Sequence, residues 1–127
     1  MFDHDPEVLA AFAEESGARI NELERGLLAL ENDPRTADPE LLNAVFRDAH
    51  SVKAGANLLG LRNVESAAHR LENVLDLLRS GRLATAPDVC QTLLDGVDLL
   101  REILESPAQQ RNLEQDKRLA ALARLAD

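Results

Sequence analysis

Apolar residues recur at alternating steps of three and four along most of this chain, the spacing that one face of an α-helix requires. The first stripe runs through Leu9, Phe12, Ser16, Ile20, Leu23, Leu27 and Leu30. Proline and glycine residues divide the pattern into five segments. The expected helices cover residues 5–32, 39–59, 62–80, 86–105 and 108–125.

The composition favours the same fold class. Aromatic residues make up 2% of the chain, with no Trp or Tyr, although hydrophobic residues make up 45%. A core of Leu, Val, Ile and Ala is typical of helix bundles, because sheets favour β-branched and aromatic residues. Short connections before the fourth segment force neighbouring helices to run antiparallel. We predict an all-α, up-down bundle with a four-helix core and a peripheral fifth helix, as one domain over residues 1–127.

The net charge and the single cysteine indicate which partners and which cellular compartment suit this chain. A formal net charge of −9 repels phosphate backbones and anionic lipids, so nucleic acid and membranes are poor partners. Cys90 falls in an apolar stripe and is expected to be a buried thiol in a reducing compartment. No cationic leader or apolar run of membrane length is found, which predicts a cytoplasmic protein. A short acidic bundle is expected to be a monomer.

A histidine in the second segment lies away from the packed face. Taking about 100° per residue, the apolar stripe centres between Val45 and Ala49, and His50 lies about 130° from that centre. Lys53 and Asn57 share its flank. The pattern therefore predicts an accessible imidazole.

Residues with almost no side chain follow this histidine. Ala54 and Gly55 come next to Lys53, and a glycine within a helix costs about 1 kcal/mol relative to alanine. Small residues at these positions would let large partner proteins reach His50, and this access would offset the cost in helix stability. A neutral imidazole is a good nucleophile near pH 7, and a lysine one turn away can hold phosphoryl oxygens.

The third segment supplies a second group of polar residues. His69 and Glu72 lie three apart on a flank beside the apolar stripe. An antiparallel neighbour could bring Glu72 to the second nitrogen of His50 and fix its tautomer. Two other interpretations stay open from the residues alone: an ordinary solvated surface, or a metal site of His50, His69 and Glu72. Lys53 argues against the metal, because a cation beside a metal site is unfavourable.

The segment resembles the phosphorylation-site helix of a known family, the histidine phosphotransfer (HPt) domain, as found at the N-terminus of the chemotaxis histidine kinase CheA. The family pattern is Phe-Arg-x-x-His-Ser-[Ile/Val]-Lys-Gly-Gly-[Ala/Ser]. This chain reads Phe46-Arg47-Asp48-Ala49-His50-Ser51-Val52-Lys53-Ala54-Gly55-Ala56. The resemblance continues without a gap through Leu59-Gly60-Leu61 and Ala68-His69-Arg70-Leu71-Glu72-Asn73.

The resemblance implies a role for each of these polar residues. His50 would be the phosphoacceptor, Lys53 a phosphoryl contact, Glu72 the acceptor that orients His50, and His69 a nearby site residue. Such a domain is not itself an enzyme. It receives phosphate from an ATP-dependent kinase domain and passes it to the aspartate of CheY- or CheB-like response regulators. No cofactor or metal is expected on this chain, since ATP and Mg²⁺ belong to the partner domains.

The chain departs from the family pattern in two places. Ala54 replaces the first glycine of the pair, and Asn57, Leu58 and Leu59 replace a smaller and aromatic run. Neither change removes a reacting group. The alternatives are a freestanding phosphorelay protein outside chemotaxis and a helical docking module that is never phosphorylated. Whether the chain is a kinase fragment or freestanding stays open.

Overall fold

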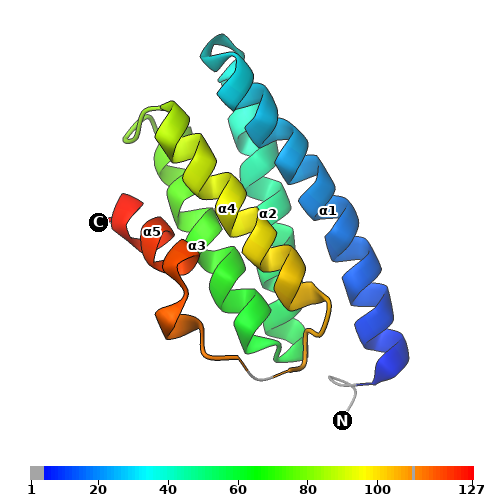
Figure 1. Cartoon of the computed structure of the whole chain (residues 1–127). Coiled ribbons are helices and arrows are strands. Elements are labelled where there is room, and N and C mark those ends of the chain that lie inside the picture. Colours follow the sequence, from blue (N-terminus) through cyan, green and yellow to red (C-terminus); the bar gives the residue numbers. More distant parts are fainter. Residues whose placement is uncertain (1–4, 110) are drawn as a thin grey trace.

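The structure is a computed structural model that describes residues 5–109 and 111–127. Its α-helices in these ranges are α1 (Pro6–Asn32), α2 (Pro39–Leu59), α3 (Arg62–Arg79), α4 (Pro87–Leu104) and α5 (Lys117–Leu125). Two short 3₁₀ turns, η2 (Pro34–Thr36) and η3 (Leu113–Gln115), lie in the connections. Figure 1 shows α1 to α4 as an antiparallel up-down bundle, with α5 against α3 and α4. The predicted fold class is confirmed.

Local sequence signals set most helix ends. The Asp5 and Asp38 side chains cap α1 and α2 by accepting hydrogen bonds from the backbone N–H groups of Glu7 and Leu41, each at 2.8 Å. Gly60 ends α2 in the left-handed conformation, with φ of 70°. A residue with a side chain is strained there, so a glycine is the residue that lets α2 turn directly into α3.

The predicted start of the fifth helix, at residue 108, is wrong. Turns and η3 occupy the beginning of this segment, and α5 begins only at Lys117. The Asn112 side chain accepts a hydrogen bond from the N–H of Glu114 at 3.1 Å, and that of Asp116 accepts one from Arg118 at 2.9 Å. Each side chain starts a new helical turn, so the segment cannot run as one helix.

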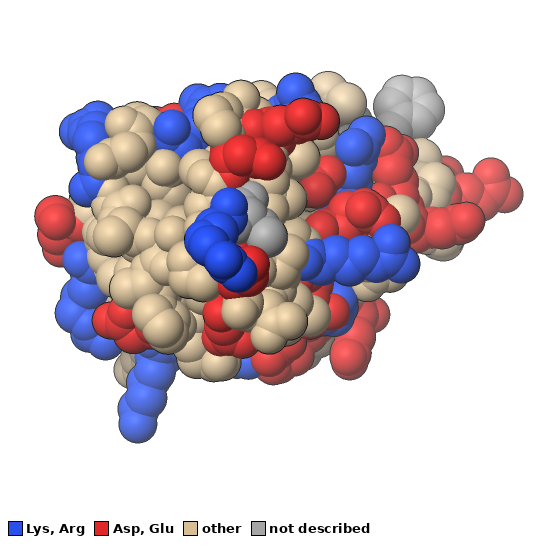
Figure 2. All heavy atoms as spheres, turned by 90° about the horizontal axis from the view of Figure 1, so that it is seen from above, with Lys and Arg blue, Asp and Glu red and all other residues tan. Residues whose placement is uncertain are grey.

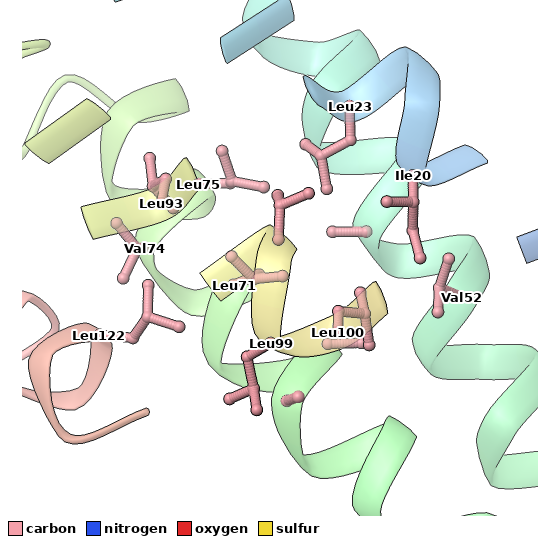
Figure 3. Close-up of a cluster of buried hydrophobic side chains, with 14 of the residues drawn as sticks. Ile20, Leu23, Val52, Leu71, Val74, Leu75, Leu93, Leu99, Leu100 and Leu122 are labelled. Carbon is pink, nitrogen blue, oxygen red and sulfur yellow. The ribbon is translucent and has the colours of Figure 1, made fainter. Parts of the chain in front are cut away.

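The core lies between the four long helices and extends under α5. Figure 3 shows Leu75 of α3 beside Leu93 of α4, Leu71 of α3 beside Leu100 of α4, and Leu122 of α5 on the outer side. All five side chains are buried. The apolar stripes read from the sequence therefore form one continuous core, and α5 closes its outer side.

Arginine side chains fasten the outer helices to the bundle. Arg101 of α4 donates two hydrogen bonds of 2.9 Å to the carboxylate of Glu24 on α1. Arg118 of α5 pairs with both Glu102 of α4 and Asp116, and these carboxylates raise its pKa. Arg101 thus joins helices that are far apart in the sequence, and Arg118 joins the consecutive helices α4 and α5.

The exposed surface carries many acidic groups. Figure 2 shows the bundle from above, with many acidic side chains on the right-hand side. This is the side toward which the N-terminal end of α1 points in Figure 1. Among the helices described, none combines the length and apolar character needed to cross a membrane.

A glycine sets the close approach of α1 to α2 and leads to a stability prediction. A Cβ atom at Gly26 would lie 2.3 Å from Cγ1 of Val45, so Gly26→Ala requires the Val45 side chain or the helices themselves to shift. We expect this variant to lose about 1–3 kcal/mol of unfolding free energy, as overpacked cores do, measured by urea denaturation.

Gly17→Ala is the matched control in the same helix. Nothing lies within 4 Å of a Cβ added there, so its higher helix propensity should stabilise the protein by about 0.5–1 kcal/mol. Equal stabilities for the two variants would show that the close contact of α1 and α2 is not required.

Candidate functional site

His50 lies on the exposed side of α2, in the middle of the bundle's length. Its side chain is 53% exposed, whereas its neighbours on the packed face, Ala49 and Val52, are buried. Both belong to the stripe that faces the core, and His50 is rotated away from it. The predicted accessibility of this imidazole is therefore present in the structure.

Two charged side chains meet beside this ring. Glu72 of α3 contacts Nδ1 of His50 through Oε2, and its other oxygen accepts a hydrogen bond of 2.7 Å from Nζ of Lys53. The Glu72 side chain is only 11% exposed, so it lies deeper than the flank position that the sequence predicts. The antiparallel packing of α2 on α3 brings these three residues together.

The electrostatics of Glu72 determine the tautomer of His50. Burial alone would raise the pKa of Glu72, but the hydrogen bonds and charges of Lys53 and His50 outweigh burial and lower it. Glu72 is therefore a carboxylate at neutral pH, and a carboxylate can only accept hydrogen bonds. A neutral His50 must then carry its hydrogen on Nδ1, which leaves the lone pair of Nε2 available.

The lowered pKa of Glu72 predicts a loss of stability in acid. As the pH falls, Glu72 is protonated in the unfolded chain before it is protonated in the folded protein. The reason is that the ordinary Glu pKa of about 4.5, which applies to the unfolded chain, is higher than the lowered pKa in the folded protein. The stabilisation by the carboxylate is complete above about pH 4.5 and is lost as the pH falls through the folded-state pKa. We expect Glu72→Gln to be less stable than wild type at pH 7, with a difference that shrinks in acid.

Urea denaturation of the two proteins at pH values from about 7 down to about 3 measures this difference. Glu105→Gln, an exposed position after the end of α4, provides the control for removing one negative charge. A difference between Glu72→Gln and wild type that grows in acid would contradict the assigned direction of the pKa shift.

Lys53 and His69 border a polar hollow next to this group. Its lining comprises Lys53, Asn57, Arg62, Glu65, Ser66 and His69. In the described part of the chain, His69 forms no hydrogen bond or ion pair with His50, Lys53 or Glu72. The structure thus brings three of the four predicted site residues into contact and leaves His69 as a neighbour of Lys53. His4 lies outside the described residues.

Gly55 has a different use from the one expected. A Cβ at this position would lie 3.0 Å from Cε1 of Phe12 on α1, so the small size of Gly55 serves helix packing on the side away from His50. Ala54 is the exposed residue one turn after His50. The open surface next to the imidazole comes from Ala54, and the expected role of Gly55 in giving access to His50 is wrong.

Two residues near His50 were not singled out from the sequence. The Phe46 ring is stacked on the imidazole, with centroids 6.0 Å apart and planes at 13°. Cζ of Arg79 lies 3.7 Å from the centroid of the Phe46 ring. The spacing of four between Phe46 and His50 indicates a shared face, whereas nothing local in the sequence places Arg79, at the end of α3, over that ring.

The sequence model of the Hpt domain family matches residues 7–108. The chain belongs to the Hpt domain family. The matched range includes all of the four long helices except the first residue of α1, and with them His50, Lys53 and Glu72. The α5 helix lies beyond the matched range.

Similar proteins include the chemotaxis protein CheA of several bacteria. This Hpt domain is 42% identical over 97 residues to the chemotaxis protein CheA of Rhizobium meliloti, a match that covers 76% of this chain and 12% of that protein. The chain therefore spans about an eighth of the length of that relative.

Solved structures of similar length agree with the sequence match. The CheA phosphotransferase domain from Thermotoga maritima has a TM-score of 0.73 and 30% identity, covering 81% of this chain and 96% of that one. The phosphorylated P1 domain of CheA3 from R. sphaeroides, solved in complex with CheY6, has a TM-score of 0.76 and 28% identity, covering 94% and 92%. In both cases the structural match extends over more than nine-tenths of the solved domain.

Proposed function

We propose that this Hpt domain is a phosphoryl carrier in chemotaxis signalling, with His50 as the phosphoacceptor. The observation that carries the proposal is the half-exposed imidazole whose Nδ1 is held by the buried Glu72 carboxylate. An ordinary surface histidine has no need of a buried carboxylate that is itself held by a lysine. The relationship to CheA proteins supports the same function.

The geometry suggests how each group takes part. Nε2 of His50 attacks the γ-phosphorus of ATP held by a kinase domain, and the bond from that phosphorus to the bridging oxygen of ADP breaks. The ring gains a positive charge while Nδ1 keeps its hydrogen, and Glu72 stabilises that charge. In the return step, an aspartate oxygen of a response regulator attacks the phosphorus and the N–P bond breaks.

Lys53 has a double role in this proposal. One of its three N–H groups is used by Glu72, and the other two remain available for phosphoryl oxygens. Its charge also keeps Glu72 ionised. His69, which lines the same polar hollow as Lys53, is proposed only as a neighbour of the phosphoryl group.

The partners follow from the same chemistry. We propose an ATP-dependent histidine kinase domain as donor and a CheY- or CheB-like receiver domain as acceptor. The carrier has no active site for ATP in this scheme and uses no cofactor of its own, since ATP and Mg²⁺ belong to these partners. The proposed location is the cytoplasm, where ATP is available and the buried Cys90 thiol stays reduced.

A labelling experiment tests the proposal. The protein is incubated with a CheA catalytic fragment and ATP labelled at the γ-phosphate, and the label is then challenged with a CheY-type regulator. We expect a label that is labile in acid and stable in base, and that leaves the domain when the regulator is added. A label that is stable in acid, or no label with competent kinase fragments, would contradict the proposal.

A further inference from the structure

The hydrogen bond that Nδ1 of His50 donates to Glu72 does not by itself fix the imidazole. This contact and the covalent attachment at Cβ hold one side of the ring, but the ring can still rock about the line that joins Cβ and Nδ1. The side chain is 53% exposed, so core packing does not restrict it either. Another contact must set the plane of the ring if Nε2 is to have a defined direction.

Phe46 supplies that contact. It lies one helical turn before His50 on α2, and the two rings are nearly parallel, with an interplanar angle of 13° and centroids 6.0 Å apart. Offset parallel pairs at 4.5–7 Å are a favourable arrangement for aromatic rings. The stack restrains rocking of the ring about the line from Cβ to Nδ1, which is the motion that the hydrogen bond leaves free.

Phe46 is in turn held from the neighbouring helix. Cζ of Arg79 lies 3.7 Å from the centroid of its ring, within the range of a cation–π contact. Arg79 also donates a hydrogen bond of 2.7 Å to Asp76, one turn before it on α3. Asp76 itself lies one turn after Glu72, so α3 supports the imidazole both at Nδ1 and, through Arg79 and Phe46, at its plane.

We propose that Phe46 is a positioning residue that sets the plane of the His50 ring, and that Arg79 keeps Phe46 in place. This inference rests on the proposed role of His50 as phosphoacceptor. Neither Phe46 nor Arg79 needs to touch the phosphoryl group. Their effect is on the direction of the Nε2 lone pair, and small errors in the direction of attack slow a displacement strongly.

Replacing the ring tests this role. Phe46→Leu keeps an apolar side chain but removes the stack, and we expect single-turnover phosphorylation at saturating kinase fragment to slow by about three- to tenfold. Phe46→Tyr keeps the stack and should restore the rate to within about twofold of wild type. The concentration of kinase fragment at half-maximal rate should not change, because docking is left intact.

A spectroscopic measurement separates positioning from simple packing. In wild type, the carbon-bound protons of the His50 ring should show a ring-current shift from Phe46 in the NMR spectrum. This shift should be lost in Phe46→Leu and kept in Phe46→Tyr. Because it needs no kinase, it tests the placement of the ring even if wild type proves not to be labelled, a result that would contradict only the proposed function.

Arg79→Met provides a second variant in case Phe46→Leu does not fold. It removes the cation but keeps a long apolar side chain, and it should slow phosphorylation by about two- to threefold and reduce the ring-current shift. Arg82→Met, at an exposed arginine just beyond α3, should leave both measurements unchanged. Wild-type rates and ring shifts in folded Phe46→Leu, or equal slowing in the leucine and tyrosine variants, would overturn the proposal.

Discussion

His50→Gln is expected to abolish phosphorylation by a CheA catalytic fragment while leaving the helical bundle intact. Glutamine has no nucleophilic nitrogen at the position of Nε2, so no N–P bond can form. The side chain is half-exposed and outside the core, so we expect a change of less than about 1 kcal/mol in the unfolding free energy. Radiolabel incorporation and urea denaturation measure the two effects.

His69→Gln is the comparison variant for this experiment. It removes the other described histidine, on the adjacent helix, but leaves the acceptor nitrogen of His50 in place. We expect this variant to retain an acid-labile label. A label that survives in His50→Gln and disappears in His69→Gln would assign the acceptor role to His69 instead.

Glu72→Gln is expected to have the second-largest effect, a fall of about a hundredfold in the rate of phosphorylation. Glutamine has almost the same shape and can still accept the hydrogen bond from Lys53. It lacks the negative charge that holds Nδ1–H and stabilises the charged ring as phosphate is transferred. Losing a preorganised group of this kind typically costs about 10²–10³ in rate.

The measurement is the single-turnover rate with saturating kinase fragment, accompanied by circular dichroism to confirm that the bundle is folded. Glu105→Gln removes one negative charge at an exposed position distant from α3 in sequence and should keep the wild-type rate. A Glu72→Gln protein that is phosphorylated as fast as wild type would show that the contact with His50 does not serve the reaction.

Short-range patterns determined the helices of this protein. Steps of three and four placed the apolar stripes, and Asp5, Asp38 and Gly60 marked helix ends that the structure reproduces. The late start of α5 escaped prediction because Asn112 and Asp116 cap new turns inside a run that otherwise has helical spacing. Capping side chains and apolar spacing are both local signals that act within one or two helical turns. In this segment the apolar spacing is weak, so the sequence alone does not show where the helix begins.

The exposed position of His50 was also determined by the sequence, because rotation about a helix axis depends only on residue number. What surrounds His50 was decided by tertiary structure. The depth of Glu72, the use of Gly55 against Phe12, and the place of Arg79 over Phe46 all depend on how α1, α2 and α3 pack. Helical periodicity tells which way a side chain points from its own axis, but the distance to another helix is set by the side chains that interdigitate between them.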